Sequence, residues 1–203
     1  MIPFVLHSYR RCPFAIRVRM TLEEKNLKYT VIEEDLSHPS EELLRLHPEG
    51  KVPLLIHSGV SIHESAVITE YLDEISGPPY LMPTEPLARA QVRLWTFWCH
   101  EFFKPDLELF KYEWNQISEI ERTSLLGRLR EHLAKLTSSL GPHPFLMGEQ
   151  LTLADIHLFP FYRQLQKSRP DFSTCFEAAK LDLWLERITS RPSFERVMRK
   201  IAP

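Results

Sequence analysis

Short apolar runs alternate with helical patterns in the first third of the chain. Apolar and β-branched residues predict strands over 3–6, 27–33, 52–56 and 60–62. Amphipathic spacing predicts helices from Pro13 to about Lys25, from Ser40 to Leu46 and from Ser65 to Ile75. Strands that alternate with helices favour an α/β unit with parallel pairing, and the short link before residue 60 adds an antiparallel hairpin.

The pattern changes at a proline-rich segment, residues 77–86, which opens with Gly77-Pro78-Pro79. Beyond it the periodicity is helical, and we expect helices over about 87–112, 117–140, 174–188 and 192–201. Thr152-Leu153-Ala154-Asp155 matches a variant of the capping box in which aspartate replaces the usual glutamate at position N3 of the helix. We therefore predict an α/β domain over 1–76, a linker over 77–86 and an all-helical domain over 87–203.

Composition narrows the class of protein. The chain has 203 residues, 43% hydrophobic and 26% charged, which suits a globular protein with a real core. A net charge of −2 gives no support for a nucleic-acid partner. The apolar runs are too short to span a bilayer, and the N-terminus lacks the pattern of a signal peptide. We expect neither nucleic acid nor membrane as a partner.

The number and spacing of the cysteines and histidines indicate the redox environment of the protein and whether it binds a metal. The three cysteines, Cys12, Cys99 and Cys175, are odd in number and far apart, so no disulfide framework is implied. That usage favours a reducing, cytoplasmic location. The histidines are scattered without zinc-ligand spacing, so we expect no metal site. Cys99 and Cys175 lie in helical patterns without a cluster of cations like the one around Cys12, and both are interpreted as structural.

Cys12 is the candidate reactive group. It stands between the first predicted strand and a helix that Pro13 opens, and proline suits the first helical position. A thiol there faces unpaired N–H groups and the positive end of the helix dipole. These groups and four nearby cations, Arg10, Arg11, Arg17 and Arg19, predict a pKa below that of free cysteine. The alternative is a buried structural cysteine.

Two further sites are placed to complete a ligand pocket. In Lys51-Val52-Pro53, a cis bond would turn the Val52 backbone outward to pair with a peptide ligand, whereas the alternative is an ordinary edge-strand proline. At Glu64-Ser65, a strand meets a helix. The N–H groups there suit a carboxylate and Glu64 could accept an ammonium group, whereas the alternative is a plain helix cap.

Taken in order, these motifs resemble the cytosolic glutathione transferase superfamily. The motifs are Cys-Pro-Phe-Ala after a first strand, Gly-Lys-Val-Pro, Glu-Ser before a helix, and Leu-Thr-Leu-Ala-Asp in a helical second half. The Cys-Pro-Phe-Ala start is most similar to the cysteine-type branches, omega-like and dehydroascorbate-reductase-like. The resemblance implies a thioredoxin-like N-terminal domain that binds glutathione, an all-α C-terminal domain, and a homodimer.

The resemblance also implies roles for particular residues. Cys12 takes the catalytic position, with Pro13 and Phe14 beside it in the glutathione site. Val52 precedes a cis proline, Pro53, and pairs by its backbone with the cysteinyl part of glutathione. The γ-glutamyl end is held by Glu64 and Ser65, and Asp155 matches a capping aspartate with a folding role. The glycyl carboxylate usually meets a basic side chain; the corresponding region has His38 followed by Pro39, and Lys51 is the candidate.

The absence of a second cysteine in Cys12-Pro13-Phe14-Ala15 predicts a monothiol cycle. Our hypothesis is a thiol transferase that acts on a disulfide substrate through a mixed disulfide with glutathione. The alternatives are conjugation or isomerisation of small electrophiles, as in detoxification, and a non-catalytic binding or regulatory protein of the same fold. A second-substrate pocket is expected between the domains. Candidates for its wall, which equally suit a core, are Trp95, Trp98, Phe102, Phe103 and Tyr112.

Overall fold

The structure is a computed structural model that describes residues 4–168 and 178–200. It divides into two compact units. The first comprises the chain up to Met82 together with the segment that begins at Ser190, and the second runs from Pro83 to Thr189. The helical domain expected over 87–203 therefore differs from the second unit at its C-terminal end, because the last segment joins the first unit.

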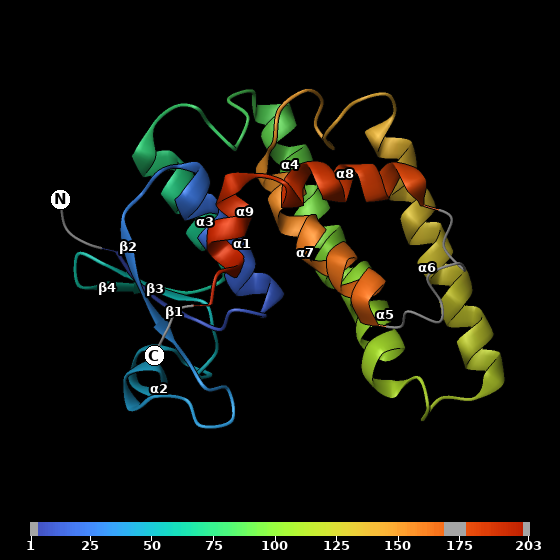
Figure 1. Ribbon diagram of the computed structural model, residues 1–203, viewed down its shortest axis with the longest axis horizontal. Coiled ribbons are helices and arrows are strands. Elements are labelled where there is room, and N and C mark those ends of the chain that lie inside the picture. The colour runs from blue at the N-terminus through green and yellow to red at the C-terminus, as the bar shows by residue number, and fades with distance from the viewer. Residues whose placement is uncertain (1–3, 169–177, 201–203) are drawn as a thin grey trace. The chain divides into compact units, whose positions relative to one another are not determined.

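The first unit contains a mixed sheet, and its described strands number four, in the order β2-β1-β3-β4 (Figure 1). The strands are β1 (Phe4–Ser8), β2 (Tyr29–Glu33), β3 (Leu54–His57) and β4 (Val60–Ile62). β1 pairs with β2 in parallel and with β3 antiparallel, and β3 pairs antiparallel with β4. The combination of parallel pairing and a hairpin is as expected. β3 starts two residues later than predicted, and Pro53 has no N–H to give to the ladder.

The helices of the first unit are α1 (Pro13–Glu24), α2 (Glu41–Leu46), α3 (Ser65–Ser76) and α9 (Pro192–Met198). α1 packs against α3, and both contribute to one core cluster with the sheet. The buried residues of this cluster are Phe4, Leu6, Val18, Leu22, Leu55, Ile68 and Leu72. This core holds the start of α1 and the start of α3, where the candidate residues lie, in fixed positions.

The last helix, α9, is tied to the end of α1 by charged contacts. Arg191 binds Glu24 through two hydrogen bonds of 2.7 Å, and Ser193 donates to the same carboxylate. Arg196 pairs with Glu23 one residue earlier. Although burial alone would raise the pKa of Glu24, hydrogen bonds from Arg191 and Ser193 lower it. α9 ends at Met198, and residue 201 of the predicted helix lies outside the described residues.

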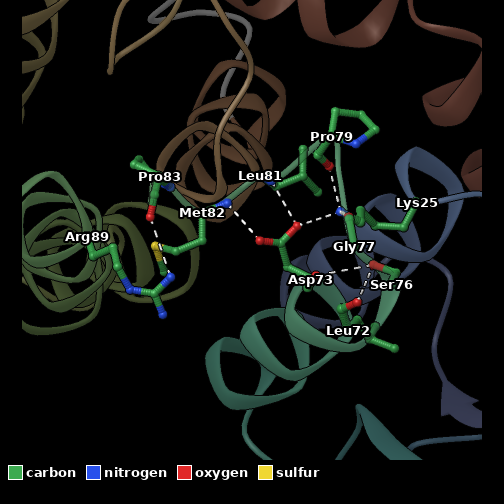
Figure 2. Close-up of polar contacts among 10 residues, drawn as sticks. All are labelled: Lys25, Leu72, Asp73, Ser76, Gly77, Pro79, Leu81, Met82, Pro83 and Arg89. Atoms are coloured by element: carbon green, nitrogen blue, oxygen red, sulfur yellow. Dashed lines mark hydrogen bonds and ion pairs between the residues drawn. The ribbon is translucent and has the colours of Figure 1, made fainter. Parts of the chain in front are cut away.

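Asp73, on α3, fixes the first half of the expected linker to the first unit (Figure 2). Its Oδ1 accepts hydrogen bonds from the Lys25 ammonium and the Leu81 N–H, both at 2.8 Å, and its Oδ2 accepts from the Met82 N–H at 2.9 Å. The Lys25 ammonium also donates to the carbonyls of Gly77 and Pro79. The segment before Pro83 is therefore anchored by a buried ion pair rather than left as a free tether.

In the part of the second unit that the structure describes, every regular element is a helix. These are α4 (Pro86–Trp98), α5 (Lys104–Glu108), α6 (Glu119–Leu140), α7 (Leu153–Ser168) and α8 (Ala179–Thr189), with π-helical turns η1 (Cys99–Phe103) and η2 (Leu109–Glu113). The helix expected over 87–112 is thus interrupted twice. Pro105 lacks an N–H for the regular ladder, and a wider turn before a proline accommodates that loss.

The long helix α6 matches its prediction closely. Ser118 and Glu121 form a reciprocal capping box at its start. Its buried face is the expected leucine stripe, namely Leu125, Leu129, Leu133, Leu136 and Leu140. α8 begins at Ala179, whereas the predicted start near Thr174, together with Cys175, lies outside the described residues. No helix within 4–168 or 178–200 is both long and apolar enough to cross a membrane.

Asp155 organises the start of α7. Its carboxylate accepts hydrogen bonds from the Leu146 N–H at 2.8 Å, from the Thr152 N–H at 2.9 Å and from the Trp184 indole N–H at 2.9 Å. The Thr152 hydroxyl donates to the same carboxylate. Asp155 is fully buried. Its one carboxylate therefore connects three segments through these hydrogen bonds: the loop before α7, the start of α7, and α8.

Candidate active site

Cys12 lies at the N-terminus of α1, as predicted. It is the N-cap residue with extended backbone angles, its carbonyl accepts the Ile16 N–H at 2.9 Å, and Pro13 opens the helix. The Cys12 thiol donates a long hydrogen bond to the Val52 carbonyl, with 3.9 Å between sulfur and oxygen. The loop that carries Val52 is therefore in direct contact with the candidate reactive group.

Ionisation of Cys12 differs from the expectation. Burial raises the pKa of the Cys12 thiol, and this effect outweighs the backbone N–H groups of Ala15 and Phe14 and the positive charge of Arg17, all of which lower it. The prediction of a lowered pKa is therefore wrong for this structure. Sequence spacing identified the helix N-terminus correctly but could not show how much protein surrounds the sulfur.

Three of the four arginines near Cys12 in sequence make their contacts elsewhere. Arg10 donates from its backbone to Glu33 at 2.7 Å and from its guanidinium to the Met198 carbonyl at 3.3 Å. Arg11 is exposed and lies over the Tyr9 ring. Arg19 is buried, its side chain hydrogen-bonds that of Tyr29, and the charge of Glu33 acts on it. The predicted cluster of four cations around Cys12 is therefore reduced to one.

The remaining cation, Arg17, belongs to the site. Its side chain is fully buried, its guanidinium stacks over the Phe14 ring at 5.1 Å, and its Nη1 donates to the Ser65 hydroxyl at 3.3 Å. It is also the side chain whose charge lowers the pKa of Cys12. Arg17 thus connects the Cys12 turn of α1 with the first residue of α3. In the sequence, nothing distinguishes Arg17 from the three other arginines near Cys12.

The Val52-Pro53 peptide bond is cis, as the resemblance implied. Pro53 is buried and Val52 is half-buried, so the pair is positioned beside Cys12 and also held by the sheet. Lys51, the candidate for the glycyl carboxylate, is exposed and pairs with Glu49, which raises the pKa of the Lys51 ammonium. His38 is also exposed and faces Asp35.

At the start of α3, Glu64 rather than Ser65 occupies the N-cap position. Glu64 has a φ of 67° and its side chain makes no capping hydrogen bond. This left-handed conformation is uncommon for a residue with a side chain and occurs often where function constrains the backbone. Glu64 is exposed, whereas Ser65 is 2% exposed and accepts the Arg17 hydrogen bond. A plain Ser65 helix cap is therefore not what the structure contains.

Two basic side chains that sequence analysis did not select lie in the same neighbourhood. The His47 and His63 rings are 4.9 Å apart. Burial and the charge of His63 lower the pKa of His47, while the charges of Glu49 and Glu64 act in the opposite direction. Neither histidine stands in a motif, so spacing alone gave no signal for them.

The aromatic residues selected for a second-substrate wall separate into different environments. Phe103 and Trp98 are buried and stacked on each other, with ring centroids 5.7 Å apart. Phe102 and Tyr112 are exposed. Trp95 and Trp98 line a cleft in the second unit. Cys99 is fully buried, in agreement with a structural role.

Comparison with known families decides the class of protein. The model of the glutathione S-transferase N-terminal domain matches residues 6–80, and the model of the C-terminal domain matches residues 93–192. The chain belongs to the glutathione S-transferase family. The expected fold, a four-stranded mixed sheet with helices followed by an all-helical part, is confirmed by this match and by the architecture above.

Individual relatives agree with the family and differ in detail. The chain is 34% identical over 185 residues to a probable glutathione S-transferase parC of Nicotiana tabacum, covering 89% of this chain and 82% of the relative. It is 30% identical over 187 residues to a stringent starvation protein A homolog of Haemophilus influenzae, covering 92% and 86%. A Tau class glutathione S-transferase structure from mango matches with a TM-score of 0.88 at 27% identity, covering 98% and 93%.

These findings support an enzyme family that uses glutathione as co-substrate. They do not specifically support the omega-like or dehydroascorbate-reductase-like branch, since the structural relative just described is of the Tau class. Across the described residues, no group of three or more histidine, cysteine, aspartate or glutamate side chains could hold a metal ion.

Proposed function

We propose that this member of the glutathione S-transferase family is a cysteine-type enzyme that transfers glutathione through a mixed disulfide on Cys12. The observation that carries the proposal is the position of the thiol. It stands at a helix N-terminus, 3.9 Å from the Val52 carbonyl, and remains partly accessible. A thiol at such a place can exchange with a disulfide that is presented to it.

The proposed glutathione-binding site consists of the residues grouped around Cys12. The Val52 backbone pairs with the cysteinyl part as an added strand would. The γ-glutamyl carboxylate binds at the start of α3, where the first N–H groups have no intrahelical partner and Ser65 supplies a hydroxyl. Its ammonium group binds the exposed Glu64. The glycyl carboxylate pairs with the ammonium group of Lys51. This pair replaces the ion pair that Lys51 forms with Glu49 in the structure.

Both steps of the cycle are thiol–disulfide exchanges. Cys12 first loses its proton to water, and the thiolate attacks the glutathione sulfur of a glutathionylated substrate. The substrate thiolate leaves and takes up a proton, and Cys12 holds glutathione as a mixed disulfide. A second glutathione thiolate then attacks the same glutathione sulfur, which releases oxidised glutathione and the Cys12 thiolate. This cycle consumes reduced glutathione, in accord with the cytoplasmic location that cysteine usage predicts.

One observation favours a second function, conjugation of glutathione to small electrophiles. The raised pKa of Cys12 keeps its thiol protonated near neutral pH, so the S–H group could donate a hydrogen bond to the thiolate of bound glutathione instead of attacking it. A binding or regulatory role without catalysis is the third candidate, because a fold does not by itself fix a function. In each case we expect a homodimer, as the family resemblance implies.

The test is the intact mass of the protein after incubation with oxidised glutathione. We expect one added glutathione per chain that a reductant removes, absent from Cys12→Ala and retained in Cys99→Ala, whose thiol is buried. A folded wild-type protein without the adduct would overturn the proposal. Turnover of a model aryl halide with glutathione would then indicate conjugation, and glutathione binding without turnover would indicate a binding protein.

A further inference from the structure

His7 is a buried histidine that the proposed chemistry does not use. It lies on β1, its side chain is fully buried, and its Nδ1 is 2.6 Å from Oε1 of Glu34. The same carboxylate accepts hydrogen bonds from the Ser40 N–H at 2.9 Å and from the Ser40 hydroxyl at 2.7 Å. Ser40 is the N-cap of α2, and its hydroxyl accepts the Leu43 N–H. A chain of hydrogen bonds therefore connects the sheet to the first turn of α2 through one carboxylate.

The contacts of Glu34 fix which nitrogen of His7 donates. Burial alone would raise the pKa of Glu34, but hydrogen bonds from His7 and Ser40 lower it, so Glu34 is a carboxylate. A carboxylate only accepts hydrogen bonds, and Nδ1 of His7 is therefore the protonated donor. The other ring nitrogen, Nε2, is buried and has no hydrogen-bond partner among the described residues. The charge of His7 thus depends on whether Nε2 also holds a proton.

The Glu42 carboxylate, in the first turn of α2, faces Nε2 of His7. Its Oε2 lies 3.7 Å from Nε2, and the Glu42 side chain is half-exposed. The neighbours of His7 in the sheet, Ile32 and Leu54, are uncharged, so Glu34 and Glu42 are the charged groups that face the ring within the described residues. Without a proton, Nε2 presents a lone pair to a negative charge, whereas with a proton His7 is a cation that attracts this charge. The second proton therefore decides whether β1 attracts or repels the start of α2.

α2 leads directly into a loop of the proposed glutathione site. The helix has six residues, too few to be stable without contacts to the rest of the protein. Its contacts with the sheet therefore determine where it lies. The chain that follows it, residues 47–53, carries Lys51 and Val52, which we assign to the glycyl and cysteinyl parts of glutathione. A displacement of α2 is transmitted to both of these residues.

We propose that His7 is a positioning residue for glutathione and that its second proton strengthens glutathione binding. The inference rests on the proposed function, because it takes residues 47–53 as part of the glutathione site. Protonated His7 holds Glu34 and Glu42 together and keeps α2 in the binding position. Imidazoles change charge between about pH 5 and 8, so the affinity for glutathione falls as pH rises through this range. By reciprocity, binding of the ligand draws protons onto the protein.

The experiment is calorimetric titration of the full-length protein with S-methylglutathione, whose blocked thiol neither ionises nor exchanges with Cys12. Titrations at pH 7 in buffers of different ionisation enthalpy give the number of protons taken up per ligand. We expect wild type to take up a fraction of a proton. Its affinity should fall at least about fivefold between pH 6 and pH 8, as expected for coupling between two sites.

His7→Asn separates the hydrogen bond from the charge. The asparagine amide places a donor where Nδ1 stands, so it preserves the contact with Glu34, but it does not take up a proton. This variant should bind S-methylglutathione within about twofold of wild type at pH 8 and lack the gain in affinity at pH 6. A residue with a purely structural role would not produce this difference between the two pH values.

Glu42→Gln and Glu41→Gln form a matched pair in the first turn of α2. Both carboxylates are exposed or half-exposed, but only that of Glu42 faces His7. Glu42→Gln should lose most of the pH dependence and take up fewer protons, whereas Glu41→Gln should behave as wild type. His47 and His63 titrate in both variants, so the difference between the two profiles isolates the contribution of His7.

The outcomes distinguish this inference from the proposed function. Equal pH dependence in wild type, His7→Asn and Glu42→Gln would overturn the inference and leave the glutathione site intact. Absence of ligand binding by folded wild type would overturn the site and the inference together. Failure of Cys12 to form a mixed disulfide would not affect these titrations, since the ligand has no free thiol. If His7→Asn does not fold, the comparison of Glu42→Gln with Glu41→Gln decides.

Discussion

Two helix N-termini, one in each unit, contain an ionisable group whose pKa is raised by the surrounding protein; one of these groups is partly accessible and the other is fully buried. Cys12 stands at the start of α1, and Asp155 lies in the first turn of α7. They differ in how well they are satisfied. The Asp155 carboxylate accepts four hydrogen bonds of 2.8 to 3.0 Å. The Cys12 thiol donates one long hydrogen bond of 3.9 Å, and its sulfur faces the backbone N–H groups of Ala15 and Phe14.

The comparison separates a structural group from a reactive one. A buried polar group whose hydrogen-bonding capacity is filled holds elements together, and exchanging it leaves several partners unpaired. A buried group with weak contacts contributes little to stability and remains free to react. The direction of a pKa shift does not distinguish these two cases, but the number and length of the hydrogen bonds do.

The largest expected effect is a loss of stability on replacing the structural group, Asp155. Asp155→Ala leaves the Leu146 and Thr152 N–H groups and the Trp184 indole without their acceptor, at about 1–3 kcal/mol for each buried donor. We expect a loss of at least about 3 kcal/mol in the free energy of unfolding, measured by urea denaturation. Asp35→Ala, at an exposed position, is the control and should leave the free energy of unfolding nearly unchanged. A well-folded Asp155→Ala protein of unchanged stability would contradict the comparison.

The second prediction tests the ionisation of the reactive group, the Cys12 thiol. In wild type, alkylation of Cys12 by iodoacetamide should reach half its maximal rate above pH 8.5, about the ordinary value for cysteine, because burial raises the pKa of the thiol. Arg17→Met removes the charge that lowers this pKa, so the alkylation profile should move to higher pH. At pH 8 a smaller fraction of the thiol is then ionised, and alkylation should be roughly three- to tenfold slower.

Arg19→Met is the matched control for that change. It removes a buried arginine from the same helix, two residues further on, whose interactions involve Tyr29 and Glu33. Its alkylation profile should coincide with that of wild type. Equal displacement of the profile in the two variants would mean that the loss of a buried cation acts through stability rather than through the Cys12 site, and thermal unfolding of both proteins would reveal this.

The third prediction concerns pH and the first unit as a whole. The pKa of Glu24 is lowered in the folded state by Arg191 and Ser193 despite its burial, so its contribution to stability is present above the unfolded value of about 4.5 and is lost as pH falls through the folded value. Glu24→Gln should cost about 2 kcal/mol at pH 7 and have a smaller effect at pH 3. A pH-independent difference in urea denaturation would contradict the ion pair.

The smallest effect is expected for the stability of the reactive variant. Cys12→Ala removes a long sulfur contact and little buried surface, so the free energy of unfolding should stay within about 1 kcal/mol of wild type. If Cys12→Ala instead proved as destabilising as Asp155→Ala, Cys12 would be a structural cysteine, and the contrast between the two helix N-termini would fail.

How much of the fold can be predicted from the sequence depends on how far apart along the chain the interacting residues are. Capping patterns, proline positions and the leucine stripe of α6 are local, and they predicted most elements and the helix start at Cys12. The packing of α9 against α1 was missed because the contact between Arg191 and Glu24 crosses 167 positions and has no local signature. The split of a long helix by η1 and η2 was missed although Pro105 marks the place.

The candidate site shows the same division. The motifs identified Cys12, Val52-Pro53 and Glu64-Ser65, and the contacts of Cys12 with Val52 and of Arg17 with Ser65 lie within one unit. The pattern could not tell Arg17 from Arg19, since both interrupt the same apolar run from Ala15 to Leu22 and both are buried. Only the position of α3 decides which guanidinium meets Ser65.

The return of α9 to α1 has a consequence for biosynthesis. Glu24 and Glu23 leave the ribosome early, whereas their partners Arg191 and Arg196 are translated 167 and 173 positions later. The thioredoxin-like unit therefore cannot complete its packing while the helical unit is still being made, although N-terminal units generally fold first during synthesis. Emergence of α9, rather than emergence of the first 82 residues, is the moment at which this fold can close.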